Sequence, residues 1–397
     1  MENWKVNISG DKVIWIVVVL LSLLSLLTVY SSTVTLAYKF QQGNVYYYMI
    51  KHALILITGL GLMYASSKLN YIYYSRIFQI MLYIAIPLLL VTLFIGENIN
   101  QASRVLRIPL IGLTFQTSDL AKLTLIVYLA RQLSIKQDEI KDLKKIFVPL
   151  IIPVVLAVIL IMPANFSTAA IVLTISIVLL FVGRIRLIHL AGFIGAGIIA
   201  VAIMVAILSM MPEGYQWRYP TWKKRIESYF GNKEKGEKTT KEIPYQVMQA
   251  KIAIASGGII WGKGPGNSTQ RHFLPHPYSD FIYAIIIEEY GLVAGAIVVL
   301  LYLILFFRTI RIALKSPTLF GSLMVIGMGF SLVFQAMINM GVAVGLLPVT
   351  GQPLPLVSMG GTSLWFSSLA IGIILSVSRE TSVKKTVELN VDNDGLN

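Results

Sequence analysis

Long apolar runs recur along the whole chain, and the polar and charged residues gather in the segments between them. About 20 consecutive apolar residues are enough to cross the hydrocarbon core of a bilayer as a helix. The pattern therefore predicts ten membrane-spanning helices, several of them short or polar at one end. Their predicted bounds are residues 13–30, 52–66, 77–95, 118–130, 146–163, 168–182, 190–211, 280–307, 319–340 and 363–377.

Composition agrees with a chain embedded in a membrane. Hydrophobic residues make up 56% of the 397 residues and charged residues 13%, with a mean hydropathy of +0.74. We expect an all-α integral membrane protein, with one polytopic domain over residues 1–385 and a short cytoplasmic tail over 386–397. No small-residue cleavage site follows the first apolar run, so it is expected to remain as a helix. The absence of cysteine excludes disulfides and thiolate chemistry.

Basic residues predict the orientation of the helices. Most lysines and arginines outside the longest loop fall in segments that lie inside when the N-terminus is inside, such as 131–145 and 308–315. By the positive-inside rule, we expect both termini in the cytoplasm and the large loop 212–279, between helices 7 and 8, outside it. Cytoplasmic basic loops against anionic lipid explain most of the net charge of +14, so no nucleic-acid partner is needed.

The end of the large loop carries the strongest chemical signal. Residues 256–289 read SGGIIWGKGPGNSTQRHFLPHPYSDFIYAIIIEE, a glycine-rich, basic stretch that leads into Asp280. Glycine permits tight turns and close backbone approach. Lys263 and Arg271 would attract an anion, and Asp280 is the only acid between residues 243 and 287. A single acid beside a basic loop at a membrane surface indicates chemistry on a charged, lipid-linked substrate.

A second polar group of residues lies around the start of the fourth predicted helix. Arg104 falls in an outer loop, and Asp119 and Lys122 fall three residues apart on one helix face. Such a pair neutralises itself where an isolated charge is costly. Two interpretations stay open, a structural ion pair or a cavity in which Lys122 and Arg104 receive phosphate. Glu288 and Glu289 raise the same question.

A third segment, residues 339–363, reads NMGVAVGLLPVTGQPLPLVSMGGTS between two predicted membrane helices. It is uncharged but rich in glycine and proline. Irregular backbone at membrane depth is tolerated only where it is buried in protein or lines a cavity. The segment is therefore either a re-entrant cap or the lining of a substrate groove.

In this order, the three segments resemble the SEDS family of bacterial wall proteins, which includes FtsW, RodA and SpoVE. The resemblance extends over about residues 11–380. The GNSxQ form is closer to the division branch, FtsW, than to the elongation branch, RodA. The matching motifs are ASR at 102–104, Q-x-S-acid-x-x-K at 116–122, SGG with GKGxGNSxQ at 256–270, LPxxxSDFIYA at 274–284, EExG at 288–291 and GLLPVTGxPLPLxSxGGTS at 345–363.

The chain departs from the family pattern in three places. Family members usually carry Gly-Ala-x-Arg-Trp at 101–105, Pro-Ser-Glu at 117–119 and Gln-Pro-Asp-Leu-Gly-Thr-Ala around 162–169. The third departure leaves Asn165 in place of an acid, so no role is carried over to it. Asp119 in place of Glu keeps the charge but shortens the side chain.

The resemblance implies a multi-pass peptidoglycan glycosyltransferase of the bacterial cytoplasmic (inner) membrane. It would add lipid II units to a nascent glycan strand during cell division, with inversion and with undecaprenyl diphosphate as leaving group. Asp280 would be the general base. The implied substrate-binding residues are Arg104, Lys122, Lys263, Asn267, Ser268, Arg271, Ser358, Gly360 and Gly361, and the supporting residues are Asp119, Glu288 and Glu289.

The resemblance also implies partners: a class B penicillin-binding protein that cross-links the strand, other divisome proteins, and membrane lipids. No protein metal site is predicted, and a divalent cation that neutralises the diphosphate is left open as the one candidate cofactor. Two other functions stay open, a lipid II flippase and a non-catalytic divisome scaffold. A flippase needs a charged path through both leaflets, whereas the polar groups here cluster on the predicted outer side, which favours the enzyme.

Overall fold

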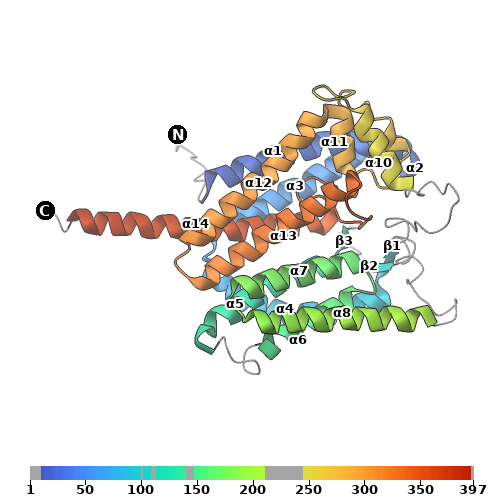
Figure 1. The fold of residues 1–397 in the computed structure, drawn as a ribbon. Helices are drawn as coiled ribbons and strands as arrows, with labels where there is room; N and C mark the ends of the chain where they lie inside the picture. The colour runs from blue at the N-terminus through green and yellow to red at the C-terminus, as the bar shows by residue number, and fades with distance from the viewer. Residues whose placement is uncertain (1–9, 100–101, 109–112, 140–146, 211–244, 395–397) are drawn as a thin grey trace.

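The computed structural model describes residues 10–99, 102–108, 113–139, 147–210 and 245–394. Most of its helices run in a similar direction, with the three short strands at one end and the projecting part of α14 at the other (Figure 1). The elements are α1 (Lys12–Ser32), α2 (Val34–Phe40), α3 (Val45–Lys68), α4 (Tyr71–Ile95), β1 (Glu97–Ile99), β2 (Ala102–Ile108), β3 (Leu113–Phe115), α5 (Thr117–Ile135), η1 (Gln137–Glu139), α6 (Val148–Ile161), α7 (Phe166–Val182), α8 (Leu187–Met210), α10 (Tyr245–Ser256), η4 (Gln270–His272), α11 (Ile282–Tyr290), α12 (Leu292–Lys315), α13 (Leu319–Ala343) and α14 (Gly361–Asp394).

Each predicted apolar run coincides with a helical segment of the structure. Within the described residues, seven helices are long and apolar enough to cross a membrane, namely α1, α3, α4, α8, α12, α13 and α14. Two further apolar helices, α6 and α7, are shorter. The predicted count of ten spans stays a prediction, and residues 212–244 of the predicted outer loop lie outside the described part of the chain.

The structure corrects the sequence prediction at the eighth span. Residues 280–307 were expected to form one helix, but α11 ends at Tyr290 and α12 begins at Leu292. Gly291 lies between them with φ of 88°, a conformation that L side chains rarely adopt. The break separates the short, buried α11 from the long, lipid-length α12, so α11 is not part of the span.

The predicted all-α class is confirmed for this predominantly helical chain, and the structure adds one short sheet to it. β1, β2 and β3 form an antiparallel three-stranded sheet in the order β1-β2-β3. The segment was taken as an outer loop because its strands are too short to show a clear alternation of apolar and polar residues. The register passes from Glu97 opposite Val105 to Asn98 opposite Ser103, so Arg104 is the extra residue of a β-bulge.

Helix α13 lies at the centre of the molecule and packs against α5, α7, α11, α12 and α14. Small residues allow these close approaches, as is common between membrane helices. A Cβ at Gly372 of α14 would overlap the Ser66 side chain of α3, so only glycine fits that crossing. From this central position, two of the few polar side chains of α13 reach the backbone around the candidate site.

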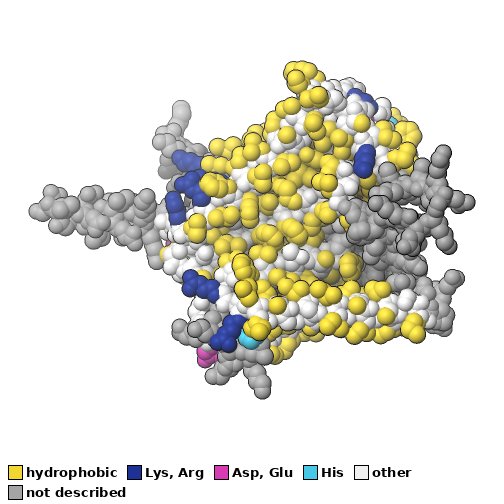
Figure 2. Space-filling model, in the orientation of Figure 1, with side chains coloured by type: hydrophobic (Ala, Val, Ile, Leu, Met, Phe, Trp, Pro, Cys, Tyr) yellow, Lys and Arg dark blue, Asp and Glu magenta, His cyan; other side chains and the backbone are white. Residues whose placement is uncertain are grey.

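The surface along the helices is mainly hydrophobic, whereas most of the lysines and arginines on the visible face gather at the end from which α14 projects (Figure 2). α1 begins and α14 ends at this same end (Figure 1). An apolar belt with a basic end is the expected surface of a protein that spans a bilayer. The chain is a multi-pass membrane protein.

Candidate functional site

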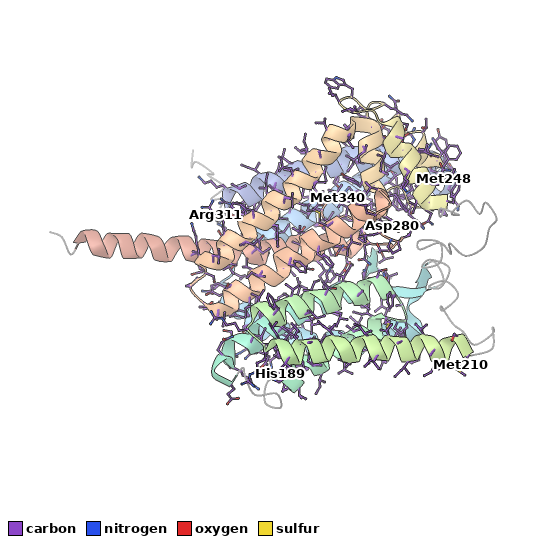
Figure 3. All side chains as sticks on the ribbon, in the orientation of Figure 1. His189, Met210, Met248, Asp280, Arg311 and Met340 are labelled. Carbon is purple, nitrogen blue, oxygen red and sulfur yellow. The ribbon has the colours of Figure 1, made fainter. Side chains whose placement is uncertain are left out.

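A cavity of about 360 Å³ lies among the ends of several elements. It is bordered by the C-terminal part of α4, strands β2 and β3, the start of α5, and the irregular segments that precede α11 and α14. Asp280 lines this cavity. Figure 3 places Asp280 and Arg311 toward opposite ends of the bundle, so the cavity lies away from the basic end.

Asp280 stands two residues before α11, and the N-cap residue of that helix is Phe281. Asp280 is therefore not the N-cap residue of this helix. Ser279 Oγ donates a hydrogen bond of 2.9 Å to Asp280 Oδ1. Burial, together with the negative charge of Asp280, raises the pKa of the neighbouring Tyr278 phenol, which also lines the cavity. The cavity thus holds a carboxylate able to accept a proton beside a tyrosine that stays protonated.

The three residues 278–280 are held through their backbone carbonyls. The Met359 N–H donates to Tyr278 O at 2.9 Å, and Ser358 Oγ donates to Ser279 O at 2.6 Å. Asn339 Nδ2 donates to Asp280 O at 2.9 Å. Three consecutive carbonyls thus receive donors from the third sequence segment, which fixes the backbone that carries the acid. Ser358, predicted to bind substrate, donates through Oγ to this backbone and accepts from the Leu354 N–H at 2.7 Å.

The predicted glycine pair, Gly360 and Gly361, lines the cavity. A Cβ at Gly361 would lie 3.2 Å from Thr114 O, so a larger residue there would push against β3. Beside it, Thr362 Oγ1 donates to Thr114 O and accepts from the Gln116 N–H. The first turn of α14, together with Gly360 before it, is therefore a cavity wall joined to β3 and the start of α5, which favours the groove interpretation over a mere cap.

The predicted charge pair on α5 is present. Lys122 Nζ lies 3.5 Å from Asp119 Oδ1 and donates a hydrogen bond of 2.7 Å to Gln335 Oε1. The two residues line a second, small cavity, and Ser363 lines both this cavity and the larger one. The predicted ion pair is therefore present, while its structural role and the role of Lys122 toward phosphate both stay predictions.

The basic, glycine-rich loop lies elsewhere. Lys263 Nζ is 2.7 Å from Glu288 Oε1, and the fully buried Glu288 carboxylate also accepts from the Thr269 N–H at 3.1 Å and from Ser268 Oγ. Arg271 Nη1 donates to Gly266 O at 2.7 Å. Lys263, Asn267, Ser268 and Arg271 are not among the residues that line the larger cavity. Their substrate-binding role stays a prediction.

Glu289 is a second buried acid that binds the glycine-rich loop 256–271. It is buried, it accepts from Ser31 Oγ of α1, and it accepts from the Ser268 N–H at 3.3 Å. A Cβ at Gly257 or Gly262 would overlap the backbone of α11 near Ile287 or Glu289. The close backbone approach expected of these glycines is confirmed, and the partner is α11. The supporting acids Glu288 and Glu289 anchor the loop to that helix.

Arg104 lies in β2 at the bulge, next to Val105, which lines the cavity. The side chain of Arg104 lies outside the described part of the structure. β-Bulges are over-represented beside active sites, where they re-aim a side chain. The position of the bulge is compatible with the predicted role of Arg104.

Sequence reasoning gave no role to two amides of α13, Gln335 and Asn339. Both are buried, and they lie four residues apart, on one face of a helix that is otherwise mostly apolar. Polar side chains inside a membrane bundle are uncommon and often functional. Two amides four residues apart in an otherwise apolar helix could therefore have been recognised from the sequence as a candidate functional pair.

The described residues contain no group of three histidine, aspartate or glutamate side chains that would hold a metal ion. A protein-only metal centre is not formed by these residues. Among the residues that the structure describes, Asp280 is the one carboxylate that lines the larger cavity.

Comparison with known proteins identifies the family. The model of the family described as "Cell cycle protein", named for FtsW, RodA and SpoVE, matches residues 11–383. The chain belongs to this family.

Curated relatives match over nearly their whole length. The chain is 34% identical over 376 residues to "Stage V sporulation protein E" of Bacillus subtilis, covering 94% of this chain and 97% of that protein. It is 30% identical over 373 residues to "Probable peptidoglycan glycosyltransferase FtsW" of Trichlorobacter lovleyi, covering 93% of each.

Solved structures share the fold. A chain from "Structural coordination of polymerization and crosslinking by a peptidoglycan synthase complex" superposes with a TM-score of 0.72 at 23% identity, covering 94% of this chain and 99% of that one. The rod shape determining protein RodA of Thermus thermophilus superposes with a TM-score of 0.65 at 23% identity, covering 94% of this chain and 98% of RodA.

Proposed function

We propose that this family member is a peptidoglycan glycosyltransferase that polymerises lipid II, with Asp280 as the general base. The observation that carries the proposal is the Asp280 carboxylate in a cavity of about 360 Å³, on a backbone held by three donors. The relatives named as probable peptidoglycan glycosyltransferases supply the reaction class.

The chemistry fits one carboxylate. The 4-hydroxyl of one sugar attacks the anomeric carbon of another, and Asp280 takes the hydroxyl proton as the new C–O bond forms. The bond from that carbon to the diphosphate oxygen breaks, and the diphosphate leaves with the electron pair. Since a diphosphate departs without being protonated, no second catalytic acid is required, in contrast to glycoside hydrolysis.

The departing diphosphate requires positive charge. We assign this role first to Arg104, because β2 borders the cavity at the bulge. A divalent cation would supply the same positive charge and would be held chiefly by the diphosphate, since the described residues form no group of metal ligands and Asp280 is assigned as the base. Lys122 stands behind the cavity wall, where Ser363 separates the two cavities.

The test is polymerisation of purified lipid II by the wild-type chain and by Asp280→Asn. Asparagine keeps the size of the side chain but cannot accept the proton, so the rate should fall by about 10²–10⁴-fold. Membrane insertion and thermal stability should be unchanged. A wild-type glycan yield from Asp280→Asn would show that Asp280 is not the base. Lipid II translocation by the wild-type chain without any polymerisation would favour the flippase.

The orientation belongs to the same proposal: both termini in the cytoplasm and Asp280 on the outer side of the inner membrane. The native chain has no cysteine, so single cysteines report cleanly. An impermeant thiol reagent should label Asn267→Cys in intact cells and Lys136→Cys only after lysis. The reverse pattern would invert the orientation.

The proposed partner is a class B penicillin-binding protein that cross-links the new strand, together with other divisome proteins. The related complex of polymerisation and crosslinking supports this assignment by analogy. Co-purification of the tagged chain with the class B protein of its own cell, and a higher polymerisation rate in that complex, are the expected results. A rate indifferent to the partner would argue against it.

A further inference from the structure

Asn339 joins the two segments that form the cavity. Its amide nitrogen donates to Asp280 O at 2.9 Å and to Gln352 O at 2.7 Å. The side chain is buried, and the Oδ1 atom has no hydrogen-bond partner among the described residues. The orientation of the amide is therefore determined: with nitrogen and oxygen exchanged, an oxygen would face two carbonyl oxygens.

Gln335 makes the matching contacts one helical turn away. Its amide nitrogen donates to Pro353 O at 3.0 Å, and its Oε1 accepts from Lys122 Nζ at 2.7 Å. The carbonyls of the neighbouring residues Gln352 and Pro353 are thus held by two amides four residues apart on α13. This arrangement links Lys122, through α13 and the 352–353 backbone, to the carbonyl of Asp280.

The carbonyls of Asp280, Gln352 and Pro353 need hydrogen-bond donors, and the two amides supply them. Both amides lie in a low-dielectric interior, where a buried carbonyl left without a donor is costly. Asp280 stands on irregular backbone before α11, and the bond from Asn339 ties its carbonyl to a different element, α13. Of the three donors to residues 278–280, Asn339 is the one that reaches Asp280 itself.

We propose that Asn339 and Gln335 are positioning residues for the reaction: Asn339 fixes the backbone of Asp280, and Gln335 fixes the same loop while it orients Lys122. This inference rests on the proposed function, in which Asp280 is the base. A displacement of a catalytic group by about 1 Å can cost about 10²-fold in rate, so losing the donor should act on the chemical step.

The experiment compares three variants of the full-length chain in lipid II polymerisation. Asn339→Leu removes both donors at similar volume and should lower kcat by about 10²-fold, with little change in KM. Asn339→Gln keeps an amide donor and should retain more of kcat than Asn339→Leu. Gln335→Glu keeps an acceptor for Lys122 but loses the donor to Pro353 O, and should also lower kcat.

The matched control is Thr309→Val. Thr309 is buried on α12, and its hydroxyl donates only within its own helix, to Leu305 O at 2.7 Å. This variant removes a buried hydrogen bond without touching the site, so kcat should stay at the wild-type value. Equal losses of kcat in Thr309→Val and Asn339→Leu would mean general destabilisation and would overturn the positioning role.

A readout independent of activity is the reactivity of a single cysteine at His276, which lines the cavity and precedes Asp280. In the His276→Cys background, Asn339→Leu should speed thiol modification, and Thr309→Val should not. If the wild-type chain makes no glycan, the proposed function fails and the thiol rate alone decides the positioning role. An unchanged thiol rate, or wild-type kcat in Asn339→Leu, overturns the inference.

Discussion

Lys263 and Glu288 form an ion pair of 2.7 Å in which the carboxylate is fully buried and the lysine remains partly exposed. The sequence predicts Lys263 as a substrate ligand, whereas this contact ties the glycine-rich loop to α11. The two roles differ in what a substitution does to stability.

Lys263→Met should destabilise the fold, because it leaves the Glu288 carboxylate buried without its cation. Breaking one partner of a buried pair costs roughly 3–5 kcal/mol, and the partial exposure of Lys263 places this pair at or below the low end of that range. Thermal unfolding in detergent measures the effect, with Lys263→Arg as the charge-retaining control. An unchanged midpoint of thermal unfolding combined with lost polymerisation would instead support the role of Lys263 as a substrate ligand.

Lys122→Met should be more damaging than Lys122→Arg. The lysine stands between Asp119 and Gln335, and Asp119 is buried. Without a cation the Asp119 carboxylate loses its counter-charge in the bundle, where an isolated charge is costly. Expression level and thermal midpoint are measured beside polymerisation. A stable but inactive Lys122→Met would favour phosphate neutralisation, and a stable, fully active one would contradict both interpretations.

Gly262→Ala should loosen the loop from α11, because the added methyl overlaps the Glu289 backbone. Overpacking of this kind costs typically about 1–3 kcal/mol. Gly192→Ala on α8 is the control, since a Cβ there meets nothing within 4 Å and alanine is the better helix former. Limited proteolysis and thermal unfolding should separate the two, and equal behaviour of both variants would argue against the tight contact.

Arg104→Ala should weaken the reaction if the bulged strand presents a cation to the diphosphate. A charge-assisted hydrogen bond contributes about 1.5–3 kcal/mol, so kcat/KM for lipid II should fall by about 10- to 150-fold. Arg104→Lys keeps the charge and should recover part of the loss. Wild-type kcat/KM in Arg104→Ala would assign the leaving-group charge to another residue or to a bound cation.

Much of the fold follows from the chain because apolar runs of membrane length leave few choices. The sequence predicted helices at α1, α13 and α14 from length and hydropathy alone. It missed the break at Gly291, because one glycine within a long apolar run does not reveal whether the helix continues. It missed the strands because pairing between residues 97–99 and 102–108 depends on tertiary surroundings.

The candidate site was predicted in part. Asp280, Gly360 and Gly361 line one cavity, as expected of a catalytic acid and a groove wall. The ion pair between Lys263 and Glu288 was not predicted, because charge alone does not reveal a buried partner 25 residues away. No role was predicted for Asn339. Its partners are main-chain carbonyls, which every residue carries, so no second side chain in the sequence marks the interaction.

The three hydrogen bonds to the carbonyls of residues 278–280 also limit which recombinant genes encode a working protein. Its donors come from residues 339, 358 and 359, encoded well downstream of the acid they hold. A recombinant gene joined between codons 281 and 338 would take the acid from one parent and all three donors from the other. A substitution at Met359 should have little effect on this contact, since only its main-chain N–H takes part. Positions 339 and 358 must each keep a side-chain donor. Crossovers in that interval should therefore yield working hybrids only when the parent that supplies the downstream part carries a side-chain donor at both positions.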